Sequence, residues 1–304
     1  MNAGIVFTER YLKLMFKQLR DATHDEVMEE LEHCRRENRR PVRVPRYFRG
    51  YFTGEKFNAS TGFEMQVFKR DNASRKLILY IHGGAFIYPP VFFHWRFLHD
   101  LCLRTHCDAL MPVYPKSPEY DCKFCVSTLL DLYNNVVNPS HYDEIHLVGD
   151  SAGAHLCLVV AQEAHKNGWA KPKTINLLSP CVDLSYSKER EMRALQDLDP
   201  MLQLDRIITL NAIWQGDLPA VHPWVSPIFG DFSGVDNLSV YYGSDEILKP
   251  DDLFLKETYE KAGKVGQFRE FAGMFHTFAM FPILEGYRAI RMMVKGITSH
   301  HPVE

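Results

Sequence analysis

The sequence predicts an α/β fold in which helices cover both faces of a mostly parallel, eight-stranded sheet. Three observations support this expectation. From about residue 60 onward, short apolar runs of strand length alternate with amphipathic segments of helical length. The run KLILYI at residues 76–81 is continuously apolar, as expected for a strand that is buried on both faces. The chain has 304 residues, of which 46% are hydrophobic and 24% charged, and this composition is typical of a globular protein and excludes a disordered chain.

The first 40 residues are expected to be helical. Apolar residues between positions 11 and 19 fall at helical spacing, Thr23 or Asp25 could cap a second helix, and Pro41 marks a boundary. Strands are then expected at residues 47–53, 62–69, 76–81, 109–114, 144–148, 174–178, 238–242 and 266–271. Helices are expected at residues 95–104, 122–136, 152–165, 251–262 and 283–294. Residues 183–223 interrupt this alternation and begin with a charged stretch, so they are interpreted as an insertion into the core.

Charge and cysteine content exclude several classes of protein. The net charge is −3, from 35 Lys+Arg and 38 Asp+Glu, which makes the chain a poor candidate for binding nucleic acid, since that needs a basic field. The densest basic run, at residues 35–40, is interpreted as a solvated helix end or linker rather than a binding site. The seven cysteines are an odd number in a chain too long to need disulfides, and this favours reduced thiols and a cytoplasmic location. Because the sequence contains no leader-like start and no run of 18 apolar residues, we expect neither a signal peptide nor a membrane span.

The clearest sign of chemistry is the motif Gly-Asp-Ser-Ala-Gly at residues 149–153. It lies between a predicted strand and a predicted helix, which is the context in which G-x-S-x-G holds a serine on a tight turn. The glycines are needed because larger side chains would collide where the turn folds back. Ser151 would then lie at the N-terminus of a helix, where negative charge is favoured, and is the candidate nucleophile.

A second motif, His-Gly-Gly-Ala at residues 82–85, directly follows the buried strand at 76–81. Two adjacent glycines allow backbone N–H groups to approach a reacting carbonyl, as an oxyanion hole requires. We expect Gly83 and Gly84 to donate from this loop, and Ala152 to donate from the position after the nucleophile. His82 is interpreted as a residue that orients the loop.

A serine nucleophile needs a base, and the base needs a carboxylate to orient it. After a turn of this kind, the acid and then the histidine follow in the chain. His276 lies in a loop just after the last predicted strand and is the candidate base. Asp245 and Glu246 follow the strand at 238–242, and either could reach the imidazole. Because adjacent residues at a strand end point in different directions, only one of them is expected to do so.

Together these motifs resemble those of the hormone-sensitive-lipase-like branch of the α/β-hydrolases, the bacterial family IV esterases especially. The resemblance covers roughly residues 60–300 and implies an α/β-hydrolase fold with a Ser-His-acid triad. Further matches are Tyr114-Pro115, Ser117-Pro118-Glu119, Ser226-Pro227 and Glu246-Ile247-Leu248. The family's acid is usually followed by Pro-Leu, and this alignment makes Glu246 the triad acid, with Asp245 as the second choice. Ala85 replaces the family's third glycine, so the donor role is transferred only to Gly83 and Gly84.

The resemblance also implies a domain arrangement and an activity. Residues 1–40 and 183–223 would form a helical cap over a core made of residues 41–182 and 224–304. The implied reaction is hydrolysis of small, short-acyl-chain esters through an acyl-enzyme intermediate on Ser151, without a cofactor, a metal, a nucleic acid or a membrane. A homodimer is left open. Seven aromatic residues could line the pocket, although packing is the favoured explanation for each of them: Phe86, Tyr88, Phe92, Phe93, Trp95, Trp214 and Trp224.

Three other functions are compatible with parts of the sequence. The same triad could cut an amide or remove acetyl groups from a sugar, an antibiotic or another small molecule. A non-catalytic ligand-binding homologue would keep the fold but lose a triad residue, whereas all three are present here. A metal enzyme could use His24, Glu30 and His33 on one helix face, although solvation of a polar face explains these residues.

Overall fold

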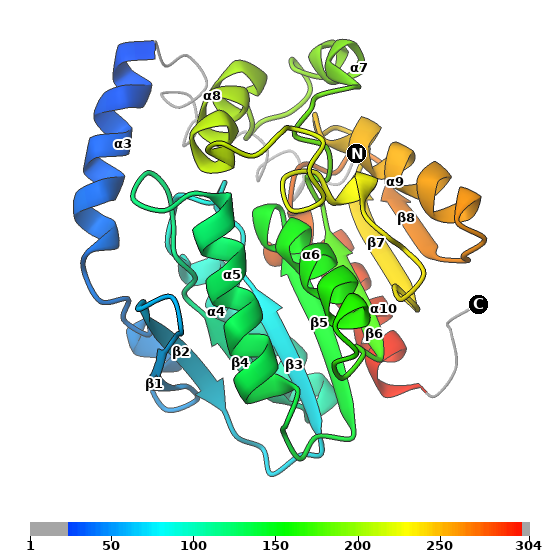
Figure 1. Ribbon diagram of the computed structural model, residues 1–304. Helices are drawn as coiled ribbons and strands as arrows, with labels where there is room; N and C mark the ends of the chain where they lie inside the picture. The colour runs from blue at the N-terminus through cyan, green and yellow to red at the C-terminus, as the bar shows by residue number, and fades with distance from the viewer. Residues whose placement is uncertain (1–23, 300–304) are drawn as a thin grey trace.

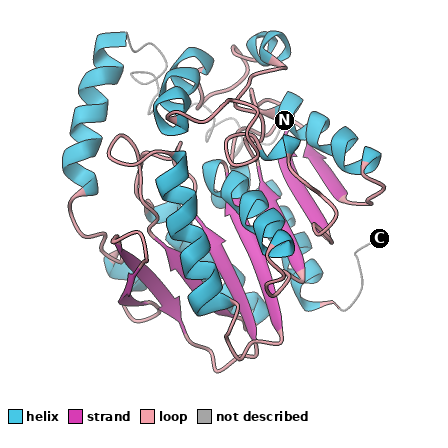
Figure 2. Cartoon of the chain, viewed as in Figure 1, coloured by secondary structure: helices cyan, strands magenta, loops and turns pink. Residues whose placement is uncertain are grey.

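The computed structural model describes residues 24–299, and the helix expected between residues 11 and 19 lies outside them. One twisted sheet passes through the molecule, with helices packed on both of its faces (Figures 1 and 2). Its 8 strands follow the order β1-β2-β4-β3-β5-β6-β7-β8. Their bounds are β1 Thr53–Asn58, β2 Glu64–Arg70, β3 Lys76–Ile81, β4 Asp108–Pro112, β5 Glu144–Asp150, β6 Thr174–Leu178, β7 Leu238–Gly243 and β8 Gln267–Phe271. The strand β2 runs antiparallel to both neighbours and β3 to β8 run parallel, so the predicted mostly parallel sheet is confirmed.

The helices divide into two layers because the central strands are apolar on both faces. The described helices are α3 His24–Asn38, α4 Phe92–Thr105, α5 Cys122–Leu132, α6 Ala152–Lys166, α7 Glu189–Ala194, α8 Leu204–Gln215, α9 Lys249–Lys261 and α10 Leu284–Thr298. In β3, Leu77, Leu79 and Ile81 pack among α5, α6 and α9, whereas Ile78 and Tyr80 pack among α4 and α10. The continuous apolar run at 76–81 is therefore a strand covered on both sides, as its sequence predicts.

The prediction of a strand at residues 47–53 is wrong. Residues Arg46–Phe48 form a 3-10 turn instead, and β1 begins only at Thr53. Phe48 and Phe52 are buried, whereas Tyr47 is exposed. The two buried residues are about one helical turn apart along the chain, instead of alternating with exposed residues as they would in a half-buried strand. The real edge strand β1 is exposed along nearly its whole length, and it therefore carries no apolar signal that could have marked it.

The interrupting segment 183–223 contains α7 and α8, and these two helices lie with α3 beyond one end of the sheet, at the top of Figure 1. Strand β5 ends at this end of the sheet, and Ser151 is the next residue. None of the helices within residues 24–299 is both long and apolar enough to cross a lipid bilayer.

Candidate active site

Ser151 lies on the turn between β5 and α6, in a backbone conformation with φ 51° and ψ −122°. The turn is tight enough to exclude side chains at its two glycines. A Cβ atom on Gly153 would lie 1.9 Å from the carbonyl oxygen of Ile81, and one on Gly149 would lie 2.6 Å from that of Gly153. Helix α6 therefore starts against β3, and the serine hydroxyl is held out beyond the end of the sheet.

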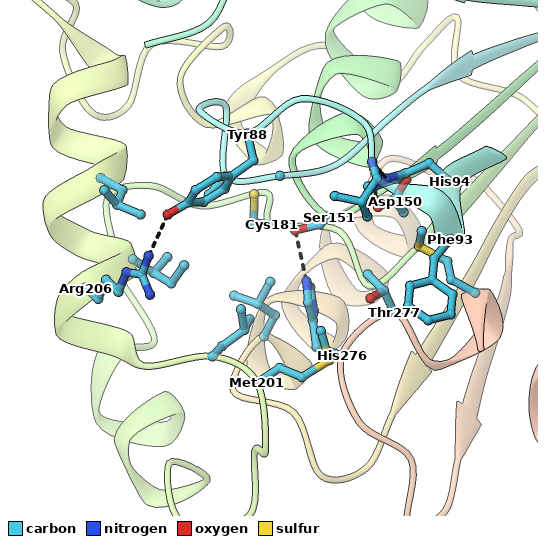
Figure 3. Close-up of a pocket in the computed structure, with 18 of the residues that line it drawn as sticks. Tyr88, Phe93, His94, Asp150, Ser151, Cys181, Met201, Arg206, His276 and Thr277 are labelled. Atoms are coloured by element: carbon cyan, nitrogen blue, oxygen red, sulfur yellow. Dashed lines mark hydrogen bonds and ion pairs between the residues drawn. The ribbon is translucent and has the colours of Figure 1, made fainter. Parts of the chain in front are cut away.

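Three side chains far apart in the sequence form a hydrogen-bonded chain at this point. His276 Nε2 lies 2.9 Å from Ser151 Oγ, and His276 Nδ1 lies 3.1 Å from Glu246 Oε2 (Figure 3 shows the first contact). With the ring proton on Nδ1, the imidazole donates to Glu246, and Nε2 is left to accept the proton of Ser151. This is the arrangement of a nucleophile, a base and an orienting acid.

The structure brings Glu246 to the imidazole and turns Asp245 away from it. Glu246 is fully buried, and its Oε1 accepts the backbone N–H of Gly243 at 3.1 Å. Asp245 instead accepts the hydroxyl of Ser244 at 2.5 Å, at the rim of the loop. The two adjacent carboxylates thus face different ways, and only one of them can orient the base.

The charge environment favours a protonated imidazole. Burial alone would lower the pKa of His276, but the hydrogen bond and the negative charge of Glu246, together with the charges of Asp199 and Asp150, outweigh it and raise that pKa above its usual value. Asp199 lies in the segment 183–223 and was not expected at the site. It is fully buried and accepts the backbone N–H groups of Met201, Leu202 and Ile247 at 2.8–2.9 Å. It therefore joins the segment 183–223 to the loop that carries Glu246.

The loop at residues 82–88, here called the oxyanion loop, differs from the expectation at one donor. The N–H of Gly83 donates to Asp150 Oδ1 at 3.1 Å, so it is already occupied and cannot also serve an oxyanion. A Cβ atom on Gly83 would lie 2.3 Å from Asp150 Oδ2, so close approach to this carboxylate explains the glycine. The assignment of Gly83 as a donor is corrected, because the carboxylate of the motif residue before Ser151 takes its proton.

The open N–H groups of this loop belong to the next two residues. Gly84 and Ala85 line the cavity beside Ser151, and within residues 24–299 the N–H groups of these two residues have no hydrogen-bond acceptor. Gly84, Ala85 and Phe86 all have positive φ, at 116°, 50° and 60°. Non-glycine residues adopt this region at a cost that surrounding contacts must offset, and such segments are typical of functional sites. Ala152 is the first residue of α6, and its N–H has no partner within the helix.

Asp150 is the residue that fixes the start of the oxyanion loop. Its Oδ1 also accepts the hydroxyl of Tyr80 at 2.5 Å, and its Oδ2 lies 3.4 Å from His94 Nε2. Burial alone would raise the pKa of Asp150, but His94 and the Tyr80 hydroxyl outweigh it and hold the pKa below its usual value. The group therefore stays a carboxylate that can accept the Gly83 proton. The sequence analysis did not identify this role, although an acidic residue inside a motif flanked by apolar elements is a usable signal.

A cavity of about 260 Å³ opens around Ser151 and His276. On one side it is bounded by Tyr88 and by side chains of α8 and the preceding loop, and on the other by Phe93 and the segment after His276 (Figure 3). Of the seven aromatic candidates, Tyr88 and Phe93 line this cavity. Phe86, Trp95 and Trp214 are fully buried in the packing instead. Residues of the segment 183–223 that the sequence did not single out make up much of the wall: Met201, Leu202, Gln203, Arg206, Ile207, Leu210 and Asn211.

The described residues contain no cluster of three His, Cys, Asp or Glu side chains arranged to hold a metal ion. Glu30, considered above as a ligand, instead pairs with Arg206 at 2.5 Å. His33 lies exposed on the same helix.

Known sequences include several that are similar to this chain. A model of the alpha/beta hydrolase fold family matches residues 78–280, which is more than half of the chain. An esterase from Acinetobacter venetianus is 29% identical over 222 residues, covering 72% of this chain and 73% of that protein. An acetyl-hydrolase from Streptomyces hygroscopicus is 28% identical over 226 residues, covering 71% of this chain and 73% of that protein.

Solved structures share the whole architecture. A putative esterase from Staphylococcus aureus superposes with a TM-score of 0.83 at 26% identity, covering 91% of this chain and 94% of that chain. A hormone-sensitive lipase from a metagenome library has the same fold, with a TM-score of 0.80 at 22% identity over 98% of both chains.

Proposed function

The chain belongs to the alpha/beta hydrolase fold family, as its resemblance to hormone-sensitive-lipase-like esterases predicted, and on that premise we propose that it is a serine carboxylesterase for small, short-acyl-chain esters. It is a carboxylic ester hydrolase, like its relatives named esterase, lipase and acetyl-hydrolase. The proposal adds the residues that carry out the reaction and the size of the substrate.

The single observation that carries the proposal is the hydrogen-bonded chain from Ser151 through His276 to Glu246, at 2.9 Å and 3.1 Å. In the first step Ser151 Oγ attacks the ester carbonyl while His276 Nε2 takes its proton. Glu246 keeps the ring proton on Nδ1 and stabilises the imidazolium. His276 then protonates the leaving alcohol, and the serine ester remains as the acyl-enzyme. In the second step His276 takes a proton from water, which attacks that ester. His276 then returns the proton to Ser151 Oγ as the bond to the acyl group breaks and the acid is released.

The tetrahedral intermediates carry a negative oxygen that needs hydrogen-bond donors. We assign this role to the N–H groups of Gly84, Ala85 and Ala152. Gly84 and Ala152 are retained from the sequence expectation, whereas Ala85 takes the place of Gly83. The support for this change is the hydrogen bond that Gly83 already makes to Asp150.

The proposed preference for short acyl chains rests on the size and chemistry of the cavity. Its volume of about 260 Å³ lies at the lower end of small-molecule pockets. Its walls combine Ser151, His276 and polar side chains such as Tyr88, Gln203, Arg206 and Asn211 with a larger number of apolar residues. We also propose that residues 183–223 and α3 form a cap over this cavity, because α8 supplies part of its wall.

A panel of p-nitrophenyl esters from acetate to palmitate tests the proposal, run with the wild type and the Ser151→Ala variant. We expect the highest kcat/KM at acetate or butyrate, and a loss of at least about 10³-fold in kcat in the variant with unchanged circular dichroism. Unchanged turnover by Ser151→Ala would overturn the assigned nucleophile. A maximum at palmitate would overturn the assigned substrate size. Matched acetanilides in the same panel separate ester from amide hydrolysis.

A further inference from the structure

We propose that helix α3 positions the oxyanion loop for catalysis, with Asn38 and Glu30 as positioning residues. The proposal rests on the proposed function, because it concerns how the assigned donors of Gly84 and Ala85 are held. Neither Asn38 nor Glu30 lines the cavity around Ser151, so each would act through the loop rather than through contact with the substrate.

The oxyanion loop is held mainly through its carbonyl oxygens. The carbonyl of Gly84 accepts the N–H groups of Ile87 and Tyr88 at 2.9 Å and 2.8 Å, and the carbonyl of Phe86 accepts the N–H of Ser117 at 2.9 Å. These bonds keep the loop in a sharp turn with three consecutive positive φ angles. Because such a conformation is costly by itself, it persists only where outside contacts impose it.

Asn38, the last residue of α3, supplies one of those outside contacts. Its Nδ2 donates to the carbonyl of Ile87 at 2.9 Å and approaches the carbonyl of Ser117 at 3.3 Å. One side-chain amide therefore joins α3 to the oxyanion loop and to the segment that supports it. The next two residues, Arg39 and Arg40, are exposed and make no contact of this kind to the loop among the described residues.

Glu30, two turns earlier on the same helix, holds the next residue of the loop, Tyr88. Its Oε1 accepts the hydroxyl of Tyr88 at 2.6 Å, and its Oε2 pairs with Arg206 of α8 at 2.5 Å. Arg206 also donates to the Tyr88 hydroxyl at 2.5 Å, a contact drawn in Figure 3. Tyr88 thus has its side chain fixed by the two cap helices while its backbone N–H holds the carbonyl of Gly84.

Apolar packing reinforces these polar contacts. Val27, Leu31 and Cys34 of α3 form a small separate core with Ile87 of the oxyanion loop and Leu210 of α8. Ile87 is fully buried there. This core contains no strand residue, so the apolar packing of the Ile87 side chain is with α3 and α8. The helix α3 therefore contacts the loop at Ile87 and at Tyr88, two and three residues after Ala85, the second of the two residues that carry the donors.

The test compares Asn38→Ala and Tyr88→Phe with Arg36→Ala, an exposed residue of the same helix. Each is measured for kcat and KM with p-nitrophenyl butyrate, and for inhibition by phenylboronic acid, whose adduct with Ser151 places a negative oxygen in the oxyanion hole. Tyr88→Phe keeps the ring and removes only the hydroxyl that Glu30 and Arg206 hold.

We expect Asn38→Ala and Tyr88→Phe to lower kcat by about tenfold, less than the loss of a whole donor, with KM within about twofold of wild type. The inhibition constant of the boronic acid should rise by a similar factor, whereas Arg36→Ala should leave all three quantities unchanged. A purely structural role would lower the melting temperature without moving kcat and the inhibition constant together.

Two outcomes would overturn the proposal. In one, both variants fold and keep kcat and the inhibition constant within twofold of wild type. In the other, only KM changes, which would make α3 a wall of the substrate pocket. Failure of the proposed function looks different, because wild type would then resist the boronic acid or Ser151→Ala would retain turnover. If Asn38→Ala does not fold, Tyr88→Phe alone decides.

Discussion

At the scale of single residues, the site depends on which of two adjacent carboxylates is buried. Glu246 lies behind His276 without solvent contact, whereas Asp245 bonds to the neighbouring Ser244 at the rim of the loop. A buried acid can fix one tautomer of the imidazole and stabilise its protonated form, which an acid turned toward solvent cannot do.

We therefore predict that Glu246→Gln lowers kcat by about 10³–10⁴-fold, because the amide no longer favours the proton on Nδ1. Asp245→Asn should lower it by no more than a few-fold. Steady-state kinetics with p-nitrophenyl butyrate measures both variants, and circular dichroism checks that the loop change has not unfolded them. A larger loss in Asp245→Asn than in Glu246→Gln would show that the acid is Asp245.

A second residue-scale prediction concerns pH. The base must be neutral to accept the serine proton, so kcat/KM falls as pH drops through the raised pKa of His276. The negative charge of Asp199 helps to raise that pKa, so Asp199→Asn should lower it and move the acidic limb of the profile to lower pH. The exposed Asp205→Asn is the matched control, and its profile should coincide with that of wild type. An unmoved limb in Asp199→Asn would contradict this account of the charge environment.

Sequence reasoning reached Ser151 and His276 because their signals are local: a motif in a strand–turn–helix context and a loop after the last strand. The choice of Glu246 over Asp245 needed the family resemblance, since neighbouring positions differ only in direction. The Gly83 assignment failed because a sequence does not show which N–H groups are already bonded. Asp199 could not be found at all, because it reaches the site through the tertiary placement of the cap.

At the scale of elements, the close contact between β3 and the start of α6 sets the position of Ser151, the proposed nucleophile. Gly153 makes that contact possible, because the space for a Cβ atom is filled by backbone of β3 and of the oxyanion loop. The sequence predicted both elements from their apolar runs. It missed the edge strand β1 because exposed strands need no apolar pattern.

We predict opposite effects of the same substitution at two helical glycines. Gly153→Ala should lower the melting temperature strongly or prevent folding, because its Cβ would lie 1.9 Å from the Ile81 carbonyl oxygen. Gly296→Ala in α10 should stabilise the protein by about 0.5–1 kcal/mol, because the added Cβ meets nothing within 4 Å and alanine favours the helix. Thermal unfolding of both variants measures this. A destabilised Gly296→Ala, or a Gly153→Ala as stable as wild type, would contradict the packing described here.

At the scale of the whole molecule, the candidate active site lies between the carboxyl ends of the central strands and helices that come from two distant parts of the chain. In the proposed function the core supplies the reacting groups, and the segment 183–223 supplies part of the wall of the cavity. The break in the strand–helix alternation marked the segment 183–223, in which α7 and α8 lie. Its contacts with the site were not predictable, because they depend on how α8 lies across the end of the sheet.

This division of labour predicts that substrate length can be changed from the cap. Ile207 of α8 lines the cavity, whereas its neighbour Ile208 packs against the main core. Ile207→Ala should raise kcat/KM for hexanoate relative to acetate by about fourfold for each newly accommodated methylene. Ile208→Ala should leave the chain-length profile unchanged. The p-nitrophenyl ester panel measures both, and an unchanged profile in Ile207→Ala would remove α8 from the acyl site.

The most direct test of the account is covalent trapping with diethyl p-nitrophenyl phosphate, followed by peptide mapping by mass spectrometry. The account predicts one diethylphosphoryl group per chain, on the peptide that contains Ser151. Esterase activity should be lost in proportion to the label, and Ser151→Ala should remain unlabelled. Inactivation with the label on another residue, or equal labelling of Ser151→Ala, would contradict it.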